Sequence, residues 1–156
     1  MHYKIIFLSL STLLLSHTVQ AEPTELDQYF INQQILDQSY KIKNRKALNE
    51  ILTVMSDEDS RVMPYQVDQN TVIEELRLYA YHMNIQGLIT TPDFSQFAAD
   101  MGDKTVKKLL KDNLIANCHL LFEHEFQRFN PYQVAVKLSS ADKSYALKIE
   151  NHECQF

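Results

Sequence analysis

The sequence contains very little glycine: Gly87 and Gly102 are the only two among 156 residues. Loops that bind nucleotide phosphates need several glycines, because bare backbone must approach the phosphate groups closely. The composition therefore argues against a P-loop or a dinucleotide-binding loop. Hydrolase motifs are absent as well, since there is no G-x-S-x-G, and His124-Glu125 lacks the second histidine of H-E-x-x-H. These absences favour a protein without enzymatic activity and without a cofactor.

Only one long apolar run is present, and it lies at the N-terminus. Lys4 precedes eleven mainly apolar residues, 5–15, and Val19-Gln20-Ala21 supplies small side chains just before Glu22. This order of a basic, an apolar and a small-residue region is typical of a secretory signal peptide. A bilayer takes roughly 20 apolar residues to span, so an uncleaved membrane anchor is the weaker alternative.

Cleavage after Ala21 would define the organisation of the chain. We predict that residues 1–21 are a cleavable signal peptide, that residues 22–156 form a single domain, and that the product is periplasmic or secreted. The mature chain would carry 14 basic and 20 acidic side chains, a net charge of −6. An acidic protein is poorly suited to nucleic acid. We therefore expect no nucleic-acid partner and, after cleavage, no stable membrane insertion.

Cysteine is equally scarce, with Cys118 and Cys154 as the only two in the sequence. An even number of cysteines in an exported protein is typical of disulfide formation. We therefore predict a disulfide between these two residues. It would close a loop of about 37 residues and contribute on the order of 4 kcal/mol by restricting the unfolded chain.

Histidines near both cysteines leave a metal site open as an alternative. His119 and Glu123 are four residues apart and would share a helix face, and His152 stands two residues before Cys154. Cysteine and histidine are zinc-ligand types, but structural zinc sites use C-x2-4-C or H-x3-5-H pairs, and this spacing differs. We therefore expect a disulfide and no metal.

The pattern of apolar residues predicts an α+β domain. Three-and-four spacing indicates helices, and two-residue alternation indicates strands. The predicted elements are a helix after residue 24, a helix over 47–55, a strand over 76–86, a short helix that starts at 91–93 and ends at the break 102–103, a longer helix over 103–127, and a hairpin of strands over 132–138 and 145–149. In the order α-α-β-α-β-β, these give a small, mostly antiparallel sheet packed by helices, with one disulfide.

The stretch 71–89 allows a second interpretation. Thr71-x-x-Glu74 has the spacing of a capping box, which would start a helix. Tyr79 and Tyr81 favour a strand instead, because aromatic residues are enriched there. These two tyrosines could also form a binding platform, although packing within the sheet is the better interpretation.

Four lysines give the clearest surface feature. Helical spacing places them on one face of the long helix, near its positive N-terminal end, where cations are mildly disfavoured. They are Lys104, Lys107, Lys108 and Lys111. We take this lysine stripe as a candidate contact for an acidic partner or an anionic surface, the alternative being an ordinary solvated helix face.

One set of short motifs resembles a group of small exported proteins of Gram-negative bacteria. The motifs are Met63-Pro64-x-x-Val67-Asp68-x-x-Thr71, Tyr79-Ala80-Tyr81, Asn117-Cys118 and the late Cys154. The resemblance covers residues 48 to 154, and the glycine-rich turn usual before the Y-x-Y strand is missing. It implies a periplasmic or secreted α+β domain and assigns no catalytic residue.

Three functional hypotheses follow. The first is an exported, non-enzymatic binding protein with an unidentified protein partner. The second is a small envelope enzyme or metal-binding protein that uses the cysteines and histidines described above. The third is a structural component of the cell envelope.

Overall fold

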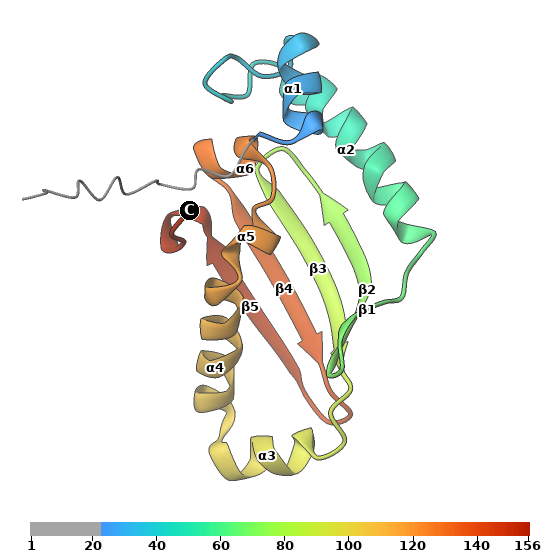
Figure 1. The fold of residues 1–156 in the computed structure, drawn as a ribbon. Helices are drawn as coiled ribbons and strands as arrows, with labels where there is room; N and C mark the ends of the chain where they lie inside the picture. Colours follow the sequence, from blue (N-terminus) through green and yellow to red (C-terminus); the bar gives the residue numbers. More distant parts are fainter. Residues whose placement is uncertain (1–22) are drawn as a thin grey trace, which may run out of the picture.

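Five strands form one sheet, in the order β1-β2-β3-β4-β5 (Figure 1). The computed structural model describes residues 23–156, so the predicted signal peptide, 1–21, lies outside the described residues. The strands are β1 (Tyr65–Asp68), β2 (Thr71–Leu78), β3 (His82–Ile89), β4 (Gln133–Ser139) and β5 (Ser144–Glu150). All neighbours are antiparallel except β3 and β4, which are parallel. The predicted α+β class with a mostly antiparallel sheet is confirmed.

In the described chain, two helices precede the strands, four lie between β3 and β4, and a short 3-10 turn follows β5. They are α1 (Glu25–Asn32), α2 (Arg45–Ser60), α3 (Phe94–Met101), α4 (Asp103–Ala116), α5 (Cys118–Leu121), α6 (Glu125–Phe129) and a final 3-10 turn, η1 (Asn151–Glu153). Parallel neighbours need a long crossover, and α3 to α6 provide it between β3 and β4. None of the described helices is long and apolar enough to cross a membrane.

The sheet buries one of its two faces. Along β4 and β5, buried side chains alternate with exposed or half-buried ones. The buried set on the three strands β3 to β5 is Met83, Ile85, Val134, Val136, Leu138, Tyr145, Leu147 and Ile149. In Figure 1, α4 and α5 lie along β4 and β5, and α2 runs beside β2. The C-terminal hairpin predicted from its alternation is thus confirmed, and the alternate apolar side chains of its two strands face the helices.

The stretch 71–89 forms two antiparallel strands, β2 and β3, instead of the single strand predicted over 76–86. The order of elements therefore differs from α-α-β-α-β-β, because three strands stand where one was predicted. The turn between β2 and β3 contains no glycine, proline, asparagine or aspartate, the residues that usually mark a turn. A contact from another element holds it instead: Asn49 Oδ1 accepts a hydrogen bond from the Ala80 backbone N–H at 2.8 Å.

The long helix predicted over 103–127 is divided into α4, α5 and α6. A straight helix over that range would be about 37 Å long. The seven-residue strands β4 and β5 span only about 23 Å. The chain therefore breaks at Asn117 and again before His124, and both Phe122 and Phe126 remain fully buried above the sheet.

A buried carboxylate fastens α1 to α6. Asp27 is fully buried and accepts hydrogen bonds from the Thr24 hydroxyl at 2.8 Å and from the Glu125 backbone N–H at 3.1 Å. Thr24 completes a capping box by accepting from the Asp27 backbone N–H. A buried carboxylate surrounded by donors avoids the cost of an unpaired charge, so this contact fixes the start of the described domain.

Helix α2 closes part of the outer edge of β2. β1 pairs only with residues 71–73 of β2. Near the other end of β2, the buried Ser56 hydroxyl accepts from the Leu78 backbone N–H at 2.8 Å and donates to the Leu52 carbonyl at 2.8 Å. A side chain thus satisfies an N–H group that a longer edge strand would otherwise pair with.

Replacing Ser56 tests this contact. Ser56→Ala leaves the Leu78 N–H buried without its acceptor, which we expect to lower the free energy of unfolding by about 1–3 kcal/mol. Thr53→Ala is the matched control, since the exposed Thr53 hydroxyl donates only to the Asn49 carbonyl of its own helix. Urea denaturation measures both. Equal midpoints for the two variants would show that α2 does not cap the strand.

Candidate protein-interaction site

The disulfide between Cys118 and Cys154 is present and confirms the prediction from the sequence. Their Cα atoms lie 5.8 Å apart across a sequence separation of 36, and Cys118 is buried. The bond joins the start of α5 to the segment after η1. Because both thiols are consumed, the metal-binding alternative loses its thiolate ligands.

The histidines of that alternative lie at the surface. His119 and Glu123 are both exposed, and the His152 side chain is exposed beside Glu150, with Nδ1 3.2 Å from a carboxylate oxygen. Within residues 23–156, no group of three or more histidine, cysteine, aspartate or glutamate side chains is placed to hold a metal ion.

The lysine stripe lies on α4 as predicted, but its members differ in their surroundings. Lys108 pairs with Asp112 at 2.5 Å, and Lys111 reaches Glu153 at 2.7 Å. Lys104 and Lys107 are exposed and, among the residues that the structure describes, take part in no ion pair. The stripe therefore offers two lysines to a partner, and its role as a contact stays a prediction.

Glu153 links the stripe to the end of the chain. The Lys111 ammonium group, together with the Glu150 backbone N–H at 2.8 Å, lowers the pKa of the Glu153 carboxyl below its ordinary value. Glu153 directly precedes Cys154, so this ion pair supports the same junction as the disulfide. Lys111 therefore stabilises the fold through this ion pair. The lysines that remain available to a partner are Lys104 and Lys107, in the N-terminal part of the stripe.

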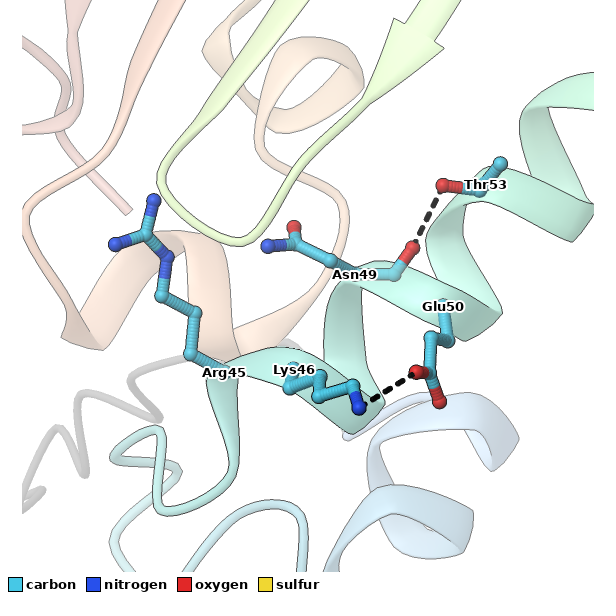
Figure 2. A pocket seen from close by; sticks show the side chains of 5 residues that line it. All are labelled: Arg45, Lys46, Asn49, Glu50 and Thr53. Atoms are coloured by element: carbon cyan, nitrogen blue, oxygen red, sulfur yellow. Dashed lines mark hydrogen bonds and ion pairs between the residues drawn. The ribbon is translucent and has the colours of Figure 1, made fainter.

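A shallow hollow of about 510 Å³ runs along the first turns of α2 (Figure 2). It is lined by Arg45, Lys46, Asn49, Glu50 and Thr53. Most of these polar groups already have partners: Lys46 faces Glu50 at 3.9 Å, Thr53 bonds the Asn49 carbonyl, and Asn49 holds the β2–β3 turn. The hollow is one face of a single helix, and it shows no convergent groups that would define a ligand site.

A second hollow, of about 380 Å³, lies beside the β2–β3 turn and is lined in part by Tyr81 and His82. Arg45 stands over the Tyr81 ring, 5.3 Å from its centroid, and the Tyr79 and His82 rings stack at 4.3 Å. The Tyr132 hydroxyl donates to the Tyr79 carbonyl at 3.0 Å, and burial raises the pKa of that phenol. Both tyrosines lie in the turn, are 36% and 38% exposed, and contact a neighbouring side chain each, so packing within the sheet does not describe them and the binding platform stays a prediction.

Three strongly exposed apolar residues lie close together in the sequence where α2 leads into β1. Val62 is 69% exposed, Tyr65 59% and Val67 51%. All four residues of β1 are exposed, and β1 stands at one end of the sheet. We call Val62, Tyr65 and Val67, together with the free edge of β1, the β1 surface. Isolated exposed apolar residues are normal, but a group of them on a strand edge indicates a contact surface.

Carboxylates surround the β1 surface. Residues 57–77 contain six carboxylates and two arginines and no lysine. Arg77 pairs with Asp57 at 2.6 Å and with Glu75 at 3.3 Å, and these hydrogen bonds raise the pKa of Arg77. Arg61 pairs with Glu58 at 3.1 Å.

The remaining carboxylates leave an excess of negative charge. Within the described residues, Asp59, Asp68 and Glu74 form no ion pair, and Asp68 and Glu74 are exposed. Asp68 ends β1, and Glu74 follows Ile73, the residue of β2 that pairs with Tyr65. The edge strand therefore lies between exposed negative charges.

Sequence reasoning did not single out the β1 surface. The motif of residues 63–71 contains all of β1, but the strand pattern within it covers only four residues. Tyr65 and Val67, two residues apart after Pro64, were the available signal. So short a pattern cannot show whether its side chains are covered.

No family model matches the sequence, and no curated protein matches it. Two solved structures are similar in shape. One is a Pseudomonas aeruginosa protein whose name describes it as secreted, with a TM-score of 0.44 and 9% identity over 71% of this chain and 96% of that one. The other is EpsS, the pilotin of the Vibrio vulnificus type 2 secretion system, with a TM-score of 0.49 and 10% identity over 72% and 96%. At these values, neither neighbour determines the fold or the function of this chain.

The ion pair of Glu153 makes stability depend on pH. Because the folded pKa is lowered, the pair stabilises the protein above the ordinary glutamate pKa of about 4.3, and this contribution is lost as the pH falls through the folded value. Glu153→Gln should therefore lower the unfolding free energy at pH 7 by less than about 1 kcal/mol, because the partly exposed pair is screened by solvent. The deficit should shrink as the pH falls below the ordinary glutamate pKa of about 4.3 and through the lowered folded pKa.

Thermal unfolding between pH 3 and 7 measures this dependence, with Asp112→Asn as the control for a more exposed pair on the same helix. A deficit of Glu153→Gln that stays constant with pH would show that packing, and not charge, is responsible.

Proposed function

We propose that this chain is an exported, non-enzymatic protein that acts by binding another protein. The observation that carries the proposal is the β1 surface, where Val62, Tyr65 and Val67 are each more than half exposed on and beside a free strand edge. An exposed apolar group bordered by charge is typical of a surface that is covered by a partner.

Export is supported by two independent features. The N-terminal pattern ending at Ala21 is that of a secretory signal peptide. The Cys118–Cys154 bond fits an oxidising compartment, because such bonds are rare in the reducing cytosol. The resemblance of residues 48–154 to small exported proteins of Gram-negative bacteria adds to this proposal, with the periplasm or the medium as the destination.

The lysine stripe supports a second contact on the same protein. Lys104 and Lys107 extend from α4, which lies over β5, whereas β1 forms the opposite edge of the sheet (Figure 1). An acidic region of a partner, or an acidic second partner, would suit these two lysines. The β1 surface is negatively charged and the lysine stripe is positively charged, so they would bind regions of opposite charge.

Mass spectrometry of the protein isolated from its own cell envelope tests the export proposal. We expect a chain that begins at Glu22 and is lighter by two hydrogens than the reduced sequence, because the disulfide removes both thiol hydrogens. A chain that retains residues 1–21, or one with two free thiols, would contradict export with processing.

Site-specific photo-crosslinking in the native cell tests the binding proposal. Replacing Tyr65 with benzoylphenylalanine should give a discrete protein adduct on irradiation, because this position would lie inside the contact. The same replacement at Leu120, which is 65% exposed on α5, is the matched control and should give none. A third variant with benzoylphenylalanine in place of Lys107 tests the lysine stripe. Equal labelling at Tyr65 and Leu120, or none at Tyr65, would contradict a specific contact at β1.

A further inference from the structure

We propose that β1 binds an extended, basic segment of its partner as an additional strand of the sheet. This inference rests on the proposed binding function and names the chemistry of the partner. Three features of the structure carry it: the free edge of β1, the apolar side chains on that strand, and the excess of carboxylates around it.

The free edge supplies the main-chain part of the contact. β1 pairs with β2 on one side and has no strand on the other side in the sheet order. An edge strand presents alternate N–H and C=O groups outward, and an extended peptide satisfies them by strand addition. The second half of the β2 edge is closed by Ser56, so the free edge is confined to the four residues of β1.

The side chains supply the specificity. The register of β1 against β2 shifts between Gln66 and Asp68, so Val67 stands at an irregularity of the strand, whereas Tyr65 pairs regularly with Ile73. Tyr65 would pack against an apolar side chain of the added strand, and Val67 would add apolar area beside it. Asp68 and Glu74, both exposed and without an ion pair in the described chain, would face its basic side chains. An alternating apolar and basic segment therefore fits this edge.

Charge also argues against a second copy of this chain as the occupant. Pairing β1 with another β1 would bring together two edges that each lie within the same excess of carboxylates. Along β5 itself, Lys148 pairs with Glu150, and Lys143, just before the strand, pairs with Asp103, both at 2.6 Å, whereas the two lysines of the stripe without an ion pair in the described chain lie on α4 and not on the strand edge. A distinct, basic partner is the occupant that this edge favours.

A synthetic peptide tests the inference. The probe is the acetylated and amidated heptapeptide Lys-Val-Lys-Val-Lys-Val-Lys, added to the disulfide-bonded chain 22–156. We expect amide NMR shifts that are largest over Tyr65–Asp68 and a measurable dissociation constant. The same peptide with N-methyl groups on alternate residues keeps its charge but loses the donors of one edge, and it should bind at least about tenfold more weakly. Replacing its lysines with glutamates should abolish binding.

Protein variants locate the contact. Val67→Lys places a positive charge on β1 and should weaken peptide binding at least about fivefold, whereas Leu120→Lys, with the same change of charge on α5, should leave it unchanged. Equal binding of the methylated and parent peptides would overturn strand addition. Binding of the glutamate peptide, or no binding of the lysine peptide, would overturn the proposal that the partner segment is basic. Equal effects of Val67→Lys and Leu120→Lys would overturn the proposal that the peptide binds at β1. Crosslinking from Tyr65 could still succeed in each case, so failure of this inference is distinguishable from failure of the binding function.

Discussion

The hydrogen bond from the Leu78 N–H to the Ser56 hydroxyl fixes α2 against one end of the outer edge of β2. Helix α2 occupies that end of the edge, whereas β1 pairs with residues 71–73 at the other end and is four residues long. The two elements thus share the outer edge of β2, and the part that α2 leaves open is the part beside which the exposed β1 surface lies.

The one-sided sheet explains how the charges are separated. Helices cover one face, so the polar side chains of the chain are distributed over the open face, the outer helix surfaces and the two edges of the sheet. The lysines lie on α4, the helix that packs against β5, and the carboxylates of residues 57–75 lie on the β1 side of the sheet. A mature chain with a predicted net charge of −6 thus still presents a basic region, and its overall charge alone does not describe what it binds.

Much of the fold could be predicted from local pattern, and the exceptions share one cause. The C-terminal hairpin and the disulfide followed from alternation and from the cysteine count, because both signals are local or unique. The β2–β3 turn could not be predicted, since Asn49 of α2 and Tyr132 at the start of β4 hold it instead of turn residues. The break at Asn117 was hidden for a similar reason: the apolar stripe continues through it, and only the length of the sheet requires the helix to bend. The β1 surface was missed because exposure is a tertiary property.

The disulfide and the β1 surface lie in different parts of the molecule, which separates stability from recognition. Cys118 and Cys154 fasten α5 to the chain end, while β1 contacts mainly β2. In Figure 1, the C-terminus lies on the α5 side of the sheet, and β1 lies on the α2 side. Distant sites without shared partners contribute almost independently to the free energy. A cysteine variant that loses its partner would therefore have lost it through unfolding, whereas a change on β1 can abolish binding in a fully folded protein.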